Sequence, residues 1–368
     1  MPHLTPAADQ QTPTLRRPRI SCLALAVMAA TLAGQPALAQ QDRMGPDAAV
    51  NRSQVERAPA RILREVRNDE RVRLTGSAHP RARTEDDRGP VQDDLVLERM
   101  ILVLQSSEAQ TQALAALQQA QQDPASPQFH QWLSPQDFAD RFGVAAADIA
   151  AISGWLTQQG FRVDEVSAGG RSIVFSGTAQ RVRAAFGVQL RQYERDGVRH
   201  IAHADEVQLP AALAAVVSGV ASLHDFRSQP QHSARPFSTP SGTGISPQAT
   251  FGNAHYLAAG DFHTIYNLKS VLAQGLNGSG RTIAVIGRSN IALSDVTQFR
   301  SGMGLPSNPP QIINGGTAPG FVSGDELESD LDVQWAGAAA PQATVKFITT
   351  ASTTTSDGIT LSAQYAVN

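Results

Sequence analysis

Cysteine is almost absent from this sequence, which holds a single one among 368 residues. One cysteine and nine scattered histidines leave no disulfide framework and no zinc-ligand spacing. Net charge is also small, at −3. This near-neutral balance gives no electrostatic reason to expect a nucleic-acid partner or an anionic membrane surface. The chain is long enough for two domains, each with a core of its own.

The N-terminus has the pattern of an export signal. Arginines precede an apolar run over residues 20–33, and residues 37–39 form a small-x-small cleavage motif. The run is too short for a transmembrane helix. We therefore predict a signal peptide over residues 1–39, which carries Cys22 with it. The mature protein is expected to be secreted or periplasmic in a bacterium, with no membrane association once the signal is removed.

Composition divides the remainder into four parts. Residues 40–92 are rich in Arg, Asp, Glu and Pro, and we expect a charged lead-in that is partly disordered. Residues 93–226 mix strand and helix patterns, which favours an antiparallel α+β unit. Residues 227–250 hold four prolines and no Asp, Glu or Lys, as in an exposed linker. Cleavage concentrates in such linkers, although a passive tether is the alternative. Residues 251–368 form the last part.

Within residues 93–226 the pattern predicts individual elements. Helices are expected over residues 108–121, after the Ser134-Pro135 cap, over 148–159, up to Phe186 and over 210–223. Strands are expected over residues 100–104, 161–163, 172–175 and 188–193. Four aromatic side chains are assigned to the core: Phe129, Trp132, Trp155 and Phe186.

Residues 251–368 show the pattern of a parallel sheet. Residues 282–286 are a near-continuous apolar run, as expected for a parallel strand that is covered on both faces. A helix over residues 295–303 and a second strand over residues 344–348 would complete a βαβ unit.

A helix with a pair of carboxylates is expected between these two strands. It runs from Glu328 to the residue before Pro341, because three apolar residues recur at helical spacing: Leu331, Trp335 and Ala338. Glu328 and Asp332 are four residues apart, so their carboxylates lie on one face. Acidic residues are also common at solvated helix starts, where the helix dipole favours them. Spacing alone therefore leaves the role of the pair open.

The residues around the pair resemble the catalytic helix of the sedolisins, the serine-carboxyl peptidases of the kumamolisin family. The matching motif over residues 324–341 is Gly-Asp-Glu-x-Glu-x-x-Leu-Asp-Val-Gln-Trp-Ala-Gly-Ala-x-Ala-Pro. The resemblance implies that Glu328 is the general base for a serine nucleophile and that Asp332 orients and supports it. A carboxylate with a pKa of about 4 remains a base in acid, where a histidine is already protonated.

Residues 93–226 resemble the activation prodomain of the same family. The motifs are Ser-Pro-x-Phe-His-x-Trp-Leu-Ser-Pro from residue 126, Asp-Phe-Ala-x-Arg-Phe-Gly from residue 137 and Phe-Ser-Gly-Thr-Ala from residue 175. The resemblance implies a ferredoxin-like fold that assists folding and blocks the cleft through an intramolecular contact, and release by cleavage within residues 227–250. Residues 251–368 resemble the N-terminal part of the family's subtilisin-like peptidase domain.

The family's other site residues have no counterpart here. Its nucleophile lies in a Gly-Thr-Ser motif that this sequence lacks, and its oxyanion aspartate and calcium loop are also expected beyond residue 368. Calcium is therefore expected from the family, without ligands in this chain. We predict an acid-acting endopeptidase precursor for protein or peptide substrates, incomplete and by itself inactive. The alternative is a catalytically dead inhibitor or folding-assistance protein. A histidine-based subtilase is disfavoured, because no histidine lies near Glu328.

Overall fold

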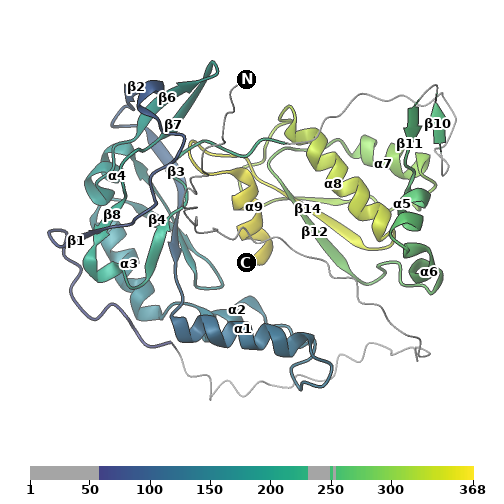
Figure 1. The fold of residues 1–368 in the computed structure, drawn as a ribbon, viewed down its shortest axis with the longest axis horizontal. Coiled ribbons are helices and arrows are strands. Elements are labelled where there is room, and N and C mark those ends of the chain that lie inside the picture. The colour runs from purple at the N-terminus through teal and green to yellow at the C-terminus, as the bar shows by residue number, and fades with distance from the viewer. Residues whose placement is uncertain (1–57, 231–248, 252–253) are drawn as a thin grey trace, which may run out of the picture. The chain divides into compact units, whose positions relative to one another are not determined.

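The structure is a computed structural model that describes residues 58–230, 249–251 and 254–368. The predicted signal peptide with Cys22, most of the predicted linker and the first part of the charged lead-in lie outside these residues. Among the described residues, no helix is long and apolar enough to cross a membrane. Figure 1 shows the described helices and strands, coloured along the chain.

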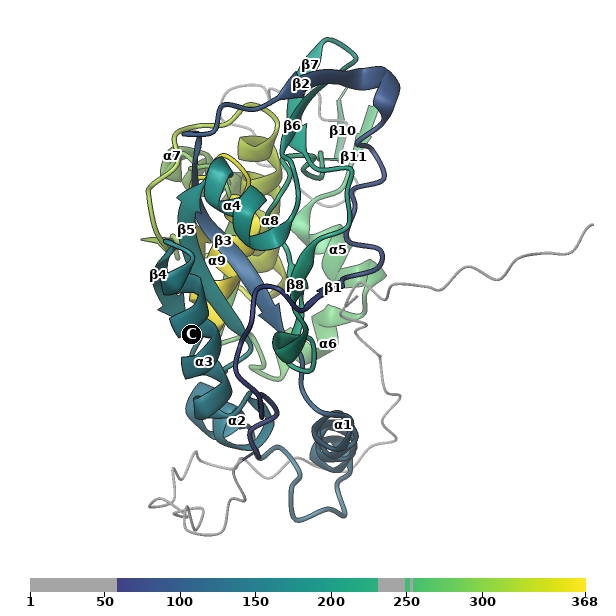
Figure 2. The same cartoon turned by 90° about the vertical axis from the view of Figure 1, so that its left-hand side faces the viewer.

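An antiparallel sheet of four strands, in the order β4-β5-β3-β9, lies at the centre of the N-terminal half of the described chain. Strand β3 (Val96–Leu104) pairs with β5 (Ser172–Thr178) on one side and with β9 (Val217–Val220) on the other. Strand β4 (Arg162–Val166) extends the sheet beyond β5, as Figure 2 shows. Four of the five residues over 100–104 are buried, which confirms the predicted buried strand.

The segment over residues 210–223 is not the predicted closing helix. It holds one short 3₁₀ turn, η3 (Ala211–Leu213), and then strand β9. Val220 of β9 lies opposite Leu102 of β3, and Val217 is buried. Because β-branched side chains suit a pleated, half-buried surface, pairing with a distant strand overrode the helix propensity of the neighbouring small residues.

The helices of this half lie where the pattern predicts them: α1 (Glu108–Gln122), α2 (Pro135–Phe142), α3 (Ala146–Gln158) and α4 (Ala179–Phe186). The predicted cap of α2 is confirmed. The Asp137 N–H donates to Ser134 Oγ at 3.1 Å, and the Ser134 N–H donates to the Asp137 carboxylate at 3.4 Å. Such a reciprocal capping box typically stabilises a helix by about 1 kcal/mol.

Two of the four aromatic side chains assigned to the core are there. Trp155 and Phe186 are 2% and 0% exposed, and their rings meet edge to face at a centroid distance of 5.5 Å. The assignment was wrong for Trp132, which is 65% exposed, and Phe129 is only half-buried. Both lie in the loop between α1 and α2, where they stack with His130 instead of entering the core.

Short strands complete the N-terminal half. One pair joins β1 (Arg71–Arg73) to β8 (Gln208–Pro210). A further antiparallel sheet has the order β2-β6-β7 and consists of β2 (Asp87–Pro90), β6 (Arg191–Arg195) and β7 (Val198–Ala202). A 3₁₀ turn, η2 (Thr84–Asp86), directly precedes β2.

The C-terminal half contains a parallel sheet of three strands in the order β12-β14-β13. Both predicted strands are present, as β12 (Thr282–Gly287) and β14 (Thr344–Thr349), with Val285 opposite Phe347. The prediction that β12 is covered on both faces was wrong, because β12 lies at the edge of the sheet and its Thr282 and Ala284 are exposed. Strand β13 (Gln311–Asn314) was not predicted. It is only four residues long and pairs with the other edge of β14.

Helices cover this parallel sheet. Both α8 and α9 pack against β12 and β14, and α7 packs against α8. The predicted helix over residues 295–303 is confirmed as α7. The elements are the hairpin β10 (Ala249–Phe251) and β11 (Ala254–Tyr256), then α5 (Ala259–Ile265), α6 (Leu268–Ala273), α7 (Leu293–Gly302), α8 (Asp325–Ala339) and α9 (Gly358–Val367).

Side chains of the loop that follows β14 bond to the backbone of β3. Three hydroxyls donate to carbonyl oxygens around the bulge in that strand: Thr353 to Glu98 at 3.0 Å, Thr354 to Val96 at 3.3 Å and Ser356 to Arg99 at 2.6 Å. The loop thus provides hydrogen-bond donors for carbonyl groups at the bulge of β3 and at the start of that strand.

Candidate active site

Helix α8 carries the predicted carboxylate pair and begins one turn earlier than predicted, at Asp325 instead of Glu328. Its N-cap is Gly324, whose φ of +85° lies in a region that glycine adopts without strain. The first turn holds three carboxylates, those of Asp325, Glu326 and Glu328. Negative charge is favourable there, because the helix dipole and unpaired N–H groups point toward it.

The buried face of α8 differs from the predicted apolar face. Leu331 is 42% exposed, whereas Val333 and Ala338 are 2% and 0% exposed. Trp335 is half-buried, with its ring 5.2 Å from that of Phe262 in α5. The sheet therefore contacts the side of α8 that carries Val333, and Leu331 lies away from it.

Glu328 and Asp332 lie one helical turn apart on α8. Glu328 is half-buried and Asp332 is exposed. Burial of its carboxyl raises the pKa of Asp332, and the Glu328 carboxylate raises it further. Because the residue remains open to solvent on one side, the effect of burial is limited. Asp332 thus holds its proton more readily than an ordinary aspartate, as expected of a coupled carboxyl pair.

Asp330, which lies between them in sequence, is the buried carboxyl that sequence reasoning missed. It is 7% exposed, and within the part of the chain that the structure describes its Oδ1 has no hydrogen-bond partner. Burial raises the pKa of Asp330 to about 6, with further contributions from Asp295 and Glu326. Its spacing from Val333 and Gly337, three and seven residues, was the available signal for this face.

Asp330→Asn is expected to stabilise the protein near neutral pH. The folded-state pKa of about 6 exceeds the usual 3.8, so the stabilising contribution of the protonated form is complete below about pH 3.8. It is lost as the pH rises through about 6. The variant should gain about 1–2 kcal/mol at about pH 7 and almost nothing at about pH 4 in urea unfolding. An equal gain in the free energy of unfolding at both pH values would contradict the conclusion that Asp330 is buried and becomes charged near neutral pH.

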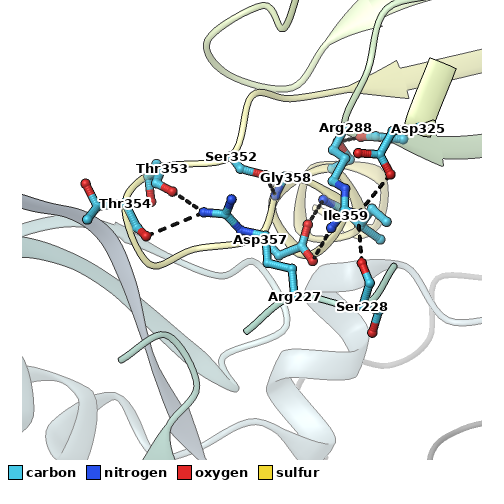
Figure 3. Close-up of polar contacts among 12 residues, drawn as sticks. Arg227, Ser228, Arg288, Asp325, Ser352, Thr353, Thr354, Asp357, Gly358 and Ile359 are labelled. Atoms are coloured by element: carbon cyan, nitrogen blue, oxygen red, sulfur yellow. Dashed lines mark hydrogen bonds and ion pairs between the residues drawn. The ribbon is translucent and has the colours of Figure 1, made fainter. Parts of the chain in front are cut away.

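Arg288 joins the start of α8 to two other segments, as Figure 3 shows. It directly follows β12 and is 6% exposed. Its Nη2 donates to Asp325 Oδ1 at 2.8 Å and to the Ser228 carbonyl at 2.8 Å. Its Nη1 donates to Asp357 Oδ2 at 3.0 Å. Sequence reasoning missed this residue, because its partners come from three separate parts of the chain.

A cavity of about 500 Å³ adjoins this network. Its lining includes Arg288 and Asp325, residues around Gly320, the start of β7 and the segment that contains Arg227. The cavity therefore lies beside the first turn of α8, close in sequence to Glu328.

Metal binding has no support among the residues that the structure describes. They contain no group of three or more His, Cys, Asp or Glu side chains that could hold an ion. Asp295 and Glu326 are acidic neighbours of Asp330, and their charges add to the rise that burial causes in the pKa of Asp330.

Comparison with known proteins gives the same family as the motifs. The model of the pro-kumamolisin activation domain matches residues 85–226. Sedolisin from Pseudomonas sp. (strain 101) is 30% identical over 230 residues, which are 62% of this chain and 38% of that protein. Kumamolisin from Bacillus sp. (strain MN-32) is 25% identical over 291 residues, which are 75% of this chain and 49% of that protein. Xanthomonalisin from Xanthomonas sp. (strain T-22) is 28% identical over 185 residues, which are 50% of this chain and 22% of that protein.

The chain thus spans less than half the length of each of these relatives. The matches agree with the motifs around α8 and in the N-terminal half, which confirms the predicted resemblance. Residues 85–226 match that family's activation domain, and the chain is similar to sedolisin-family proteins over the lengths given above.

Proposed function

We propose that this chain is the precursor part of an acid-acting serine-carboxyl endopeptidase that hydrolyses peptide bonds of protein substrates. Glu328 acts as general base and accepts the proton of the attacking serine hydroxyl. Asp332 holds Glu328 in place from the next turn of the helix. The carrying observation is the raised pKa of Asp332 one turn from Glu328, on a helix that bears the family's motif.

The serine nucleophile, the oxyanion aspartate and the calcium ligands belong to the part of the family's sequence for which this chain has no match. We propose that residues 1–368 alone therefore have no peptidase activity, since an acyl transfer needs both a nucleophile and oxyanion donors. Calcium remains an expectation from the family, and no step depends on it. We further propose export through the signal at residues 1–39, to the periplasm or the medium.

The N-terminal half is proposed to inhibit the peptidase until it is cut away. Two helices on a four-stranded antiparallel sheet support a ferredoxin-like prodomain, and the parallel strands β12, β14 and β13 support a subtilisin-like peptidase domain. Contacts from the loop after β14 to β3, and from Arg288 to the Ser228 carbonyl, support an intramolecular complex. Cleavage within residues 227–250 would release the prodomain.

Hydrolysis of a heat-denatured protein tests the function. A full-length form, extended through the family's Gly-Thr-Ser motif, should be active in acid and much slower near neutrality, whereas residues 1–368 should be inactive. An inactive full-length form would contradict the proposal. If the full-length form is inactive and residues 1–368 inhibit a related sedolisin, the alternative function, a catalytically dead inhibitor, is favoured.

A cluster of histidines near the end of the N-terminal half predicts that acid weakens the contacts there and so favours release of the prodomain. The rings of His79 and His224 are 4.1 Å apart, and His79 and His200 stack on Phe226 at 4.8 and 4.2 Å. Burial lowers the pKa of His224 to about 4, helped by the charges of His79, His203 and Arg227. Burial also lowers the pKa of His79. His232, eight residues after His224 in the predicted linker, lies outside the described residues.

His224→Gln is therefore expected to make the N-terminal half less sensitive to acid. A lowered pKa means that the neutral ring stabilises the fold fully above about pH 6.5 and loses this contribution as the pH falls toward about 4. Urea unfolding of the parent and the variant across this range checks it, with exposed His130→Gln as control. Parallel stability curves for His224→Gln and the parent would contradict the prediction.

A further inference from the structure

The start of α8 lacks the features that usually fix a helix N-terminus. Gly324, its N-cap, has no side chain with which to accept from the free N–H groups. The Glu328 N–H reaches the Gly324 carbonyl at a long 3.4 Å, whereas the Glu326 N–H donates to the Val322 carbonyl at 2.9 Å. A first turn held this loosely would fray unless another group fixed it.

Arg288 is the group that holds this turn from outside the helix. Its guanidinium binds the first residue of α8, Asp325, and the N-cap of α9, Asp357 (Figure 3). Asp357 also accepts from the Ile359 N–H at 3.1 Å, so its carboxylate is fixed on both sides. One side chain from the end of β12 thus ties together the beginnings of both helices that cover the parallel sheet.

The charges in this contact make it strong. Side-chain exposures are 7% for Arg288, 15% for Asp325 and 23% for Asp357. Burial alone would lower the pKa of Arg288, but the hydrogen bond that Arg288 donates to Asp325 and the charge of Asp357 outweigh it, so that the pKa is raised. Removing the Arg288 guanidinium would leave two largely buried carboxylates without their shared cation.

The backbone around the contact leaves little room for adjustment. A Cβ added at Gly358 would lie 2.8 Å from Arg288 Cβ and 2.1 Å from the Thr350 carbonyl oxygen. Lysine could not replace the planar guanidinium, because a single ammonium cannot match two carboxylates and the Ser228 carbonyl in this fixed geometry.

We propose that Arg288 is the positioning residue of the carboxylate pair: it replaces the missing cap of α8 and so sets the distance between Glu328 and Asp332. The proposal rests on the proposed function for its catalytic meaning. Glu328 lies three residues after Asp325, within the turn that Arg288 holds, whereas Asp332 lies on the next turn. Loss of Arg288 would let Glu328 move while Asp332 stayed. The Ser228 carbonyl, at the start of the predicted linker, is a third acceptor for the same guanidinium.

Carbon-13 NMR titration of the carboxyl groups in residues 1–368 tests the proposal. In Arg288→Lys, the pKa of Asp332 should fall by the part of its rise that the Glu328 carboxylate causes, whereas the larger part, which burial causes, should remain. Asp357→Asn is the second variant. It keeps an N-cap for α9 but removes one charge partner of Arg288, and it should shift Asp332 in the same direction.

Arg300→Lys is the matched control. Arg300 is 3% exposed and binds carbonyl groups at the opposite end of α8, donating to Gly337 at 3.2 Å and to Pro341 at 2.8 Å. It should destabilise the fold without moving the titration of Asp332. An unchanged Asp332 titration in both folded Arg288→Lys and folded Asp357→Asn overturns the proposal, and so does an equal shift in Arg300→Lys.

In a full-length form, Arg288→Lys should also lower kcat on the order of 10- to 100-fold with little change in KM. The NMR result separates the two proposals. A titration that responds to Arg288 while Glu328→Gln remains active means that the positioning is correct and that the catalytic role is wrong.

Discussion

Glu328→Gln, in a full-length form of the protein, is expected to lower kcat for hydrolysis of a denatured protein by about 10²–10⁴-fold. An amide has nearly the shape of the carboxylate but cannot accept the proton of the serine hydroxyl. The loss should be larger still if the base and the nucleophile act as a unit, because removing either then removes both. Steady-state rates at acid pH measure it.

Glu326→Gln is the matched control for this change. Glu326 lies two residues earlier in the same first turn and is half-buried like Glu328. Both variants remove one negative charge from the helix start, so any general effect on the dipole is shared. We expect the control to keep its rate within about threefold, since general-base loss is specific to one carboxylate. Comparable losses in both variants would mean that α8 needs its charge for folding and that Glu328 has no separate role.

Phe186→Ala is expected to give the largest loss of stability in the N-terminal half. The ring is 0% exposed and meets those of Trp155, Phe161 and Phe175 at centroid distances of 5.5, 5.8 and 5.9 Å. Truncating such a phenylalanine typically costs about 3–5 kcal/mol, because the transferred area is lost and a cavity remains. That is a large share of the roughly 5–15 kcal/mol that stabilises a domain.

Urea unfolding, followed by the fluorescence of Trp155, measures this loss. Trp132→Ala serves as the control, since that side chain is 65% exposed and should cost less than about 0.5 kcal/mol. The control also removes one of the other two tryptophans from the signal. A loss below about 1 kcal/mol for Phe186→Ala would show that the four rings are not a shared core.

The parts of the fold that local chemistry determines were predictable. The Ser134-Pro135 cap starts α2, and the apolar run over residues 282–286 forms β12. Each depends on neighbouring residues, so the cap and the strand can be read from adjacent positions. The burial of β12 could not, because its place at the sheet edge depends on β13 and β14. Strand β9 was missed, because its pairing with β3 joins segments far apart in sequence.

The candidate site was predictable in the same limited sense. The spacing of Glu328 and Asp332 and the family motif identify the pair, but the start of their helix depends on Arg288, whose partners lie 37 and 69 residues away. Burial of Asp330 depends on which side of α8 contacts the sheet. The side of α8 that contacts the sheet carries Val333 and Ala338. Leu331 lies away from the sheet, although it is a larger apolar residue than either. A sequence without its tertiary contacts does not distinguish these two orientations of the helix.

A double-mutant cycle on kcat/KM at acid pH tests the central claim most directly. Glu328→Gln, Asp332→Asn and the double variant are compared in a full-length form, with folding checked by urea unfolding. If the two carboxyls act as one unit, the double variant loses little more than Glu328→Gln alone, and the coupling energy exceeds about 1 kcal/mol. Near-normal rates in Glu328→Gln, or losses that simply multiply in the double variant, would contradict a coupled serine-carboxyl pair on α8.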